Sequence, residues 1–251
     1  MKKFAAVLII LLCSISLYAQ QPAPAPVDSS IVPPAPLAPK KASSGFAKFG
    51  LAAEVTLNGL STLPAGVNNN YIGGMGFAIN VQRKIYLIKN NFYFSLGLGL
   101  ATYDYATNAS ILYGSTNTST YTPNYSYFQQ ISDTSKYTKN KLNLVWLQVP
   151  LEFHIDGNPN ADGKFVDFEF GGRFGLLIND HTKYLSTDQF GDDYKVKVYD
   201  IKNLNPIATL LTAKIGYDHA NLFAYYNPLS LFKSGNGYST NEFGFGIAMT
   251  I

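Results

Sequence analysis

The most constraining feature of the sequence is an alternation of side chains between residues 166 and 176. Even positions are apolar and odd positions are charged or glycine: Val166, Phe168, Phe170, Phe174 and Leu176 alternate with Asp167, Glu169, Gly171, Arg173 and Gly175. A period of two predicts a β-strand whose two faces meet different surroundings. Residues 142–154 precede it across the turn formers DGNP (156–159) and DG (162–163), so the whole region predicts a β-hairpin. Soluble sandwiches and membrane barrels both alternate in this way, and the rest of the chain has to decide between them.

The first twenty residues have the three regions of a secretory signal peptide. Two lysines follow Met1, residues 4–17 are apolar, and the segment ends in Tyr18-Ala19-Gln20. We predict cleavage after Ala19, which makes residues 1–19 the leader; the alternative of a retained anchor needs a longer apolar run. The only cysteine, Cys13, would leave with the leader. Thiol catalysis and thiolate metal sites are therefore not expected in the mature chain.

Residues 20–45 are predicted to be a proline-rich tether. Seven of the thirteen prolines fall between positions 22 and 39. Such a stretch favours an extended, polyproline-like spacer over a packed element. The alternative is that it serves as a ligand for a partner protein.

Composition favours a membrane setting. Charged residues make up 14% of the chain and aromatic residues 14%, whereas soluble domains average about 25% charged residues. No segment after residue 20 offers about 18 consecutive apolar residues, so a closed β-barrel is the remaining way to cross a bilayer. The formal net charge is only +3, which argues against nucleic acid as a partner.

Alternating segments recur through the rest of the chain and predict an all-β fold. We expect an eight-stranded antiparallel up-and-down transmembrane β-barrel over residues 46–251, with a soluble or lipid-carrier barrel as the alternative. The expected strands are 46–57, 74–82, 92–101, 142–154, 164–178, 207–218, 222–232 and 242–251.

Small residues recur on one face of several of these strands, which indicates a narrow barrel. Residues 222–232 are apolar on both faces, so their orientation stays open. Pro150 lacks an N–H in mid-strand and predicts a bulge or a local opening of the ladder.

The connections between these strands predict the orientation of the barrel. Those at 83–91, 154–163 and 219–221 are short, whereas those at 104–141 and 179–206 are long. In outer-membrane barrels the short turns face the periplasm and the long loops face outward. We therefore expect the tether on the periplasmic side.

Eight polar residues are expected to face the lumen. They are Lys48, Glu54, Glu152, Asp167, Glu169, Arg173, Lys214 and Asp218. An eight-stranded lumen is just wide enough for side chains to fill, and buried charges must be paired, so we expect salt bridges that plug it. A conducting or proton-relaying path is the alternative.

The long connections hold the candidates for surface binding and for chemistry. Tyr113, Tyr121, Tyr125 and Tyr127 lie among Ser, Thr and Asn, a composition typical of binding loops, although a plain solvated loop has the same composition. His154 and His219 are expected at short turns. This leaves His181, with Asp180, Ser186 and Asp188, as a remote candidate for an outer-leaflet lipid hydrolase, or with Asp192 and Asp193 for a metal site. Polar loops contain such residues by chance, so no catalytic residue, cofactor or metal is predicted.

Four segments carry a family resemblance: LVWLQVPLE (144–152), GGRFG (171–175), AKIGY (213–217) and FGFGI (243–247). With them the chain resembles the PorT-like outer-membrane β-barrel proteins of Bacteroidetes. The resemblance implies a bacterial outer-membrane location, contact with outer-membrane lipid and lipopolysaccharide, and a monomer; that family has no shared catalytic residues to carry over. Two functions follow as expectations. One is a non-enzymatic barrel that stabilises the membrane or binds an extracellular partner through its long loops, and the other is a narrow pore or an accessory component of a secretion system.

Overall fold

The computed structural model describes residues 49–88, 91–114, 124–132, 137–157, 165–188 and 190–250. The expected leader, the expected tether, Lys48 and Tyr121 lie outside these residues. No helix in the described part has the length and apolar character needed to cross a bilayer.

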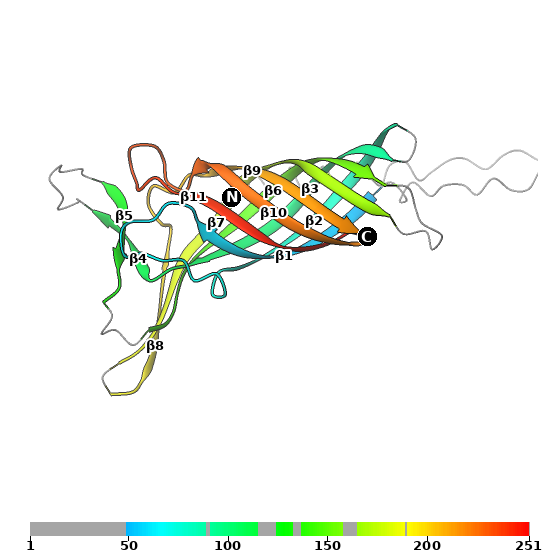
Figure 1. The fold of residues 1–251 in the computed structure, drawn as a ribbon. Coiled ribbons are helices and arrows are strands. Elements are labelled where there is room, and N and C mark those ends of the chain that lie inside the picture. Colours follow the sequence, from blue (N-terminus) through cyan, green and yellow to red (C-terminus); the bar gives the residue numbers. More distant parts are fainter. Residues whose placement is uncertain are drawn as a thin grey trace, which may run out of the picture. The chain divides into compact units, whose positions relative to one another are not determined.

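The described residues form eleven β-strands (Figure 1). They are β1 (Phe49–Leu60), β2 (Met75–Ile88), β3 (Phe92–Ala106), β4 (Ala109–Gly114), β5 (Tyr125–Gln130), β6 (Tyr137–Asp156), β7 (Val166–Thr187), β8 (Asp193–Tyr199), β9 (Ile207–Tyr217), β10 (Ala220–Ser230) and β11 (Asn241–Thr250).

Eight of these strands close into one antiparallel barrel. The hydrogen-bonded order is β6-β3-β2-β1-β11-β10-β9-β7, and the pairing of β6 with β7 closes the ring. Each barrel strand therefore pairs with its neighbours along the chain, and β11 pairs with β1. The expected eight-stranded antiparallel barrel is confirmed.

The two faces of the wall follow the alternation in the sequence. On β7, Phe168 is 48% exposed and points outward, whereas Glu169 and Arg173 are buried and point inward. The orientation of β10, which the sequence left open, places Leu222 and Tyr226 outward and Phe223 and Tyr225 inward. A belt of apolar side chains thus surrounds a polar and aromatic interior.

Glycines on the inner face let neighbouring strands approach closely. A Cβ atom added at Gly171 would clash with the carbonyl oxygen of Leu151, and one added at Gly246 would clash with that of Val55. Both contacts involve backbone atoms, which cannot move aside as a flexible side chain can. The glycines are therefore required by the tight curvature of the wall.

Two strands continue well past the barrel. β6 has 20 residues and β7 has 22, about twice the length that crosses a bilayer. The pairing of β7 with β9 ends at Leu176 and Ile207, but β7 stays paired with β6 and then with β8. We call residues 137–145 of β6, residues 179–187 of β7 and the whole of β8 the outer blade.

The outer blade corrects the expected connections. Residues 104–141 and 179–206 were expected to be long loops, but much of each is strand, including the β4–β5 hairpin and β8. Alternation continues through residues 194–198, and this is why the chain stays extended there. In Figure 1, β4, β5 and β8 lie at one end of the barrel, and the C-terminus lies at the other.

Pro150 opens the ladder without a bulge. The register of the β3–β6 pairing is the same on both sides of this site, but Val149 and Pro150 have no paired residue on β3. The irregularities of the β6–β7 pairing lie elsewhere, at Tyr137/Lys139 and at Val145/Trp146. Proline has no N–H to donate, so the ladder loses pairing locally while the strand keeps its course.

Candidate functional site

Arg173 joins opposite walls of the barrel. β7 and β1 lie four strands apart in either direction around the ring. Nonetheless, Arg173 Nη1 and Nη2 donate to Glu54 Oε2 and Oε1, each at 2.6 Å. Arg173 Nε and Nη2 also donate to Glu152 Oε1 on β6, at 3.0 and 2.7 Å. The guanidinium is fully buried, and its bidentate pair with Glu54 crosses the lumen.

Lys214 is the second cation of this layer. Its Nζ atom donates to Glu169 Oε2 at 2.7 Å and to Glu152 Oε2 at 3.2 Å. It also lies 3.5 Å from Glu54 Oε1. Three buried carboxylates therefore share two buried cations, and each cation contacts more than one carboxylate. Such mutual pairing offsets the desolvation of the charges.

Two other predicted lumen residues lie away from this group. Asp167 is buried near the short-turn end of the barrel, paired in register with Asp156. Asp218 corrects the prediction: it lies in the β9–β10 turn with a φ of 62°, beside His219 at 3.5 Å. A turn of this type needs a residue that tolerates left-handed backbone, and aspartate does so. The strand therefore ends before Asp218, which stays outside the lumen.

His154 corrects the expectation of a turn position. β6 continues to Asp156, so His154 points inward two residues after Glu152. Its Nε2 atom lies 2.7 Å from Ser95 Oγ, its Nδ1 atom lies 3.4 Å from Glu169 Oε1, and its ring stacks on Tyr93 at 4.3 Å. The alternation through Glu152 predicts the inward position of His154, because every second residue of a strand shares a face.

Glu152, His154 and Glu169 also bring possible metal-ligating atoms together. One such atom from each residue lies within 4.8 Å of the other two. Lys214 Nζ already contacts both carboxylates. The ammonium of Lys214 thus supplies the positive charge that a metal ion would bring.

Aromatic side chains occupy the lumen between the ion pairs and the end of the barrel that carries the outer blade. Tyr103, Tyr105, Tyr225 and Trp146 are all buried. The Tyr105 and Tyr225 hydroxyls are 3.1 Å apart, and Tyr225 donates to Asn58 Oδ1 at 2.8 Å. This layer leads from the charged centre to the end of the barrel that carries the outer blade.

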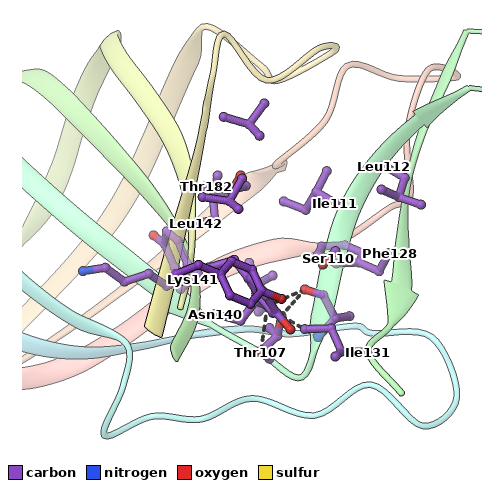
Figure 2. A pocket seen from close by; sticks show the side chains of 17 residues that line it. Thr107, Ser110, Ile111, Leu112, Phe128, Ile131, Asn140, Lys141, Leu142 and Thr182 are labelled. Atoms are coloured by element: carbon purple, nitrogen blue, oxygen red, sulfur yellow. Dashed lines mark hydrogen bonds between the residues drawn. The ribbon is translucent and has the colours of Figure 1, made fainter. Parts of the chain in front are cut away.

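A pocket of about 410 Å³ lies at that end, between the β4–β5 hairpin and the outer blade (Figure 2). Its apolar lining residues are Leu60, Ala109, Ile111, Leu112, Phe128, Ile131, Leu142, Val196 and Val198. Asn140 fixes the hairpin to the blade, because its Nδ2 atom donates to the carbonyl oxygens of Thr107 and Ala109 at 2.9 and 2.7 Å. The volume and the largely apolar lining are typical of small-ligand sites.

The family model for the outer membrane protein beta-barrel domain matches residues 40–238. The chain belongs to this family. It is therefore an integral outer-membrane barrel protein, and its outward apolar belt faces lipid. The family is generally non-enzymatic. A search of the curated proteins found no match.

The predicted binding tyrosines of this outer-membrane barrel that the structure describes, Tyr113, Tyr125 and Tyr127, do not line the pocket. Tyr113 pairs with Ser126 on one face of the β4–β5 hairpin, whereas Tyr125 and Tyr127 lie on the other face. The Tyr113 hydroxyl donates to Asn124 Oδ1 at 3.0 Å. The pocket instead takes its aromatic side chains from Phe128, Tyr105, Tyr184 and Tyr194. The alternation of apolar residues in these segments was a better indication of the binding site than their tyrosine content.

The candidates for lipid hydrolysis or metal binding do not assemble around His181. Asp180 and Ser186 lie on the face of β7 opposite to His181, and Asp180 Oδ1 accepts from the Ile201 N–H at 2.7 Å. Asp188 Oδ1 accepts from two backbone N–H groups of the β7–β8 turn. Asp193 pairs with Thr187, about 20 Å along the strand from His181. Burial and the nearby Lys197 ammonium lower the pKa of His181.

Proposed function

We propose that this outer-membrane barrel is a non-enzymatic protein that is closed to ions and binds a partner at its outer end. The observation that carries the proposal is the bidentate Arg173–Glu54 pair, which joins opposite walls in the middle of the lumen. Eight-stranded barrels have interiors that side chains fill, so a pair in this position leaves ions no continuous water path. The function then has to lie outside the lumen.

The orientation is part of the proposal. Both ends of the barrel chain, at β1 and β11, meet at the short-turn end, as an even number of strands requires. We place that end in the periplasm and the outer blade on the cell surface. Residues 1–19 would be removed on export, residues 20–45 would form a periplasmic tether, and the protein would act as a monomer. The resemblance to PorT-like proteins of Bacteroidetes supports this assignment.

The partner proposed for the pocket is an apolar group, such as an aliphatic chain or a hydrophobic side chain of an extracellular protein. Apolar atoms dominate the lining, and the polar groups that reach it, including Thr107 and Asn140, already hydrogen-bond within the protein. Few polar groups in the pocket therefore remain free to bind a charged ligand.

Conductance tests the closed lumen. In planar bilayers we expect no stepwise conductance from the wild type under conditions in which a large porin, inserted as a positive control, conducts. Reproducible small steps from the wild type would instead support the narrow pore of an export system.

A fluorescent apolar probe tests the pocket. We expect phenylnaphthylamine to bind the protein in nanodiscs at one saturable site above the background of empty discs. Thr182→Trp fills the pocket and should remove this site, whereas Ile178→Trp on the exposed outer wall should retain it. Saturation that is equal in the two variants would place the probe elsewhere.

A further inference from the structure

The outer blade has two unlike faces. Tyr184, Val196 and Val198 line the pocket on one face. The other face carries two cross-strand rows, Lys141–Lys183–Lys197 and Lys139–Leu185–Lys195, which run across β6, β7 and β8. Five lysines therefore occupy a single face of a three-stranded sheet.

This concentration of charge is unfavourable by itself. Like charges directly opposite each other in a sheet are destabilising, and Lys183 lies directly between Lys141 and Lys197. Desolvation and the four neighbouring lysines lower the pKa of Lys183. Among the described residues, Lys141 pairs with Asp104, but no ion pair involves Lys139, Lys183, Lys195 or Lys197. The same face carries two carboxylates, Asp104 and Asp193, so its five lysines exceed its carboxylates by three and the face fits an anionic surface.

The lysine face continues the outer wall of the barrel. Leu144 and Trp146 point inward, so Val145, Asn143 and Lys141 point outward on the same strand. Lys141 lies four positions before Val145, which is about 13 Å along the strand and about 10 Å in height at the usual tilt. Lysine side chains reach several ångströms further, so their ammonium groups come within range of the headgroup layer.

The direction of the blade brings the same face over the bilayer. Figure 1 shows the β7–β8 hairpin leaving the end of the barrel at an angle to the barrel strands. A sheet that bends away from the barrel turns its outer-wall face toward the membrane surface. Phe190 lies at the turn of this hairpin and is 82% exposed. An exposed aromatic ring at this point suits the membrane interface.

From these observations we infer that the outer blade docks on the outer leaflet, with its lysines binding the phosphate groups of lipid headgroups and Phe190 entering the interface. The inference deepens the proposed function and rests on its orientation. It identifies the lipid phosphate layer as a partner of the blade, while the pocket on the opposite face stays free.

A quenching experiment in nanodiscs tests the inference. The only cysteine, Cys13, lies in the proposed leader, so Asp192→Cys at the hairpin turn of a chain without the leader can carry a single bimane label. A nitroxide on a lipid headgroup reports the approach of this label to the bilayer. We expect strong quenching in discs that contain one-third phosphatidylglycerol and weak quenching in pure phosphatidylcholine. High salt should abolish the difference.

Paired lysine variants supply the control. Lys195→Gln/Lys197→Gln should lower the ratio of docked to undocked hairpin about 30-fold, because each lysine adds about fivefold near an anionic surface. Lys202→Gln/Lys233→Gln removes the same charge outside the blade and should leave the ratio unchanged.

Three results would overturn the inference: equal quenching in the two lipid compositions, equal effects of the two double variants, or release by inorganic phosphate but not by chloride at matched ionic strength. The last would indicate a site for free phosphate. None of these results depends on conductance or on the orientation in cells, so the inference and the proposed function can fail separately.

Discussion

Arg173 is the residue on which the charge balance of the lumen most depends. It is one of two cations facing three buried carboxylates, and it alone makes a bidentate pair across the barrel. A lysine could not replace it, because an ammonium lacks the planar fork that matches both oxygens of Glu54. The charge balance of the lumen therefore depends on the chemistry of a single side chain.

Replacing Arg173 tests this dependence. Arg173→Ala leaves three carboxylates with Lys214 alone, and we expect the free energy of unfolding to fall by about 3–5 kcal/mol. Urea unfolding of the reconstituted protein, followed by the fluorescence of the single tryptophan, Trp146, measures it. Arg173→Met/Glu54→Gln removes both charges of the pair and should cost less. An unchanged urea midpoint for Arg173→Ala would mean that water solvates the carboxylates and that the lumen is open.

Two adjacent glycines provide a matched test of curvature. An added Cβ at Gly171 would clash with the Leu151 carbonyl oxygen, whereas at Gly172 the nearest atom would be 3.5 Å away, an ordinary contact. We expect Gly171→Ala to destabilise the barrel by about 1–3 kcal/mol and Gly172→Ala to be near neutral. The same urea titration compares them. Equal losses at the two positions would show that close approach to the Leu151 carbonyl oxygen does not explain the glycine at position 171.

At the scale of the element, the single strand β2 has three kinds of surroundings, which are the apolar belt, the charged edge of that belt and the lumen. Its outward face carries Phe77, Ile79 and Val81 and then Arg83, while Gln82 points inward and donates to Glu152 at 2.8 Å. A charged residue on the outward face is tolerated near the bilayer edge and costly at its centre. Arg83 therefore indicates where the apolar belt ends on this strand.

Arginine substitutions along β2 test the depth of the belt. We expect Ile79→Arg to destabilise the folded barrel by about 2–4 kcal/mol and Ile85→Arg, beyond Arg83 on the same face, by about 0–1 kcal/mol. Unfolding in lipid vesicles measures both. If the two costs are equal, the belt does not end near Arg83.

At the scale of the whole molecule, the sequence predicts the eight strands of the barrel wall much better than it predicts the β4–β5 hairpin and the outer blade. Alternation, together with the apolar run at residues 222–232, located all eight barrel strands. It also placed Glu54, Glu152, Glu169, Arg173 and Lys214 on inward positions, because period-two burial is a local property. The outer blade was missed because polar positions such as Lys139 and Lys183 look like loop residues until their partners are known. His154 and Asp218 were misplaced by one or two residues at strand ends, where pairing and turn geometry decide.

Topology in cells is the corresponding prediction. With the blade outside, proteinase K added to sealed cells should cut between β4 and β5, at residues 115–123, and should leave residues 20–45 intact. Mass spectrometry of the fragments identifies the cut, and permeabilised cells serve as the control. Loss of residues 20–45 in sealed cells would reverse the orientation.

The Arg173–Glu54 pair also bears on the order of assembly. Its members are 119 residues apart in the chain, and β1 closes the barrel by pairing with β11, the last of the described strands. Glu54 therefore meets Arg173 only when β1 and β7 face each other across the lumen, and an open sheet in the bilayer would expose both charges to lipid without their partners. Closure and neutralisation become one late, cooperative event, and such distant pairing folds slowly.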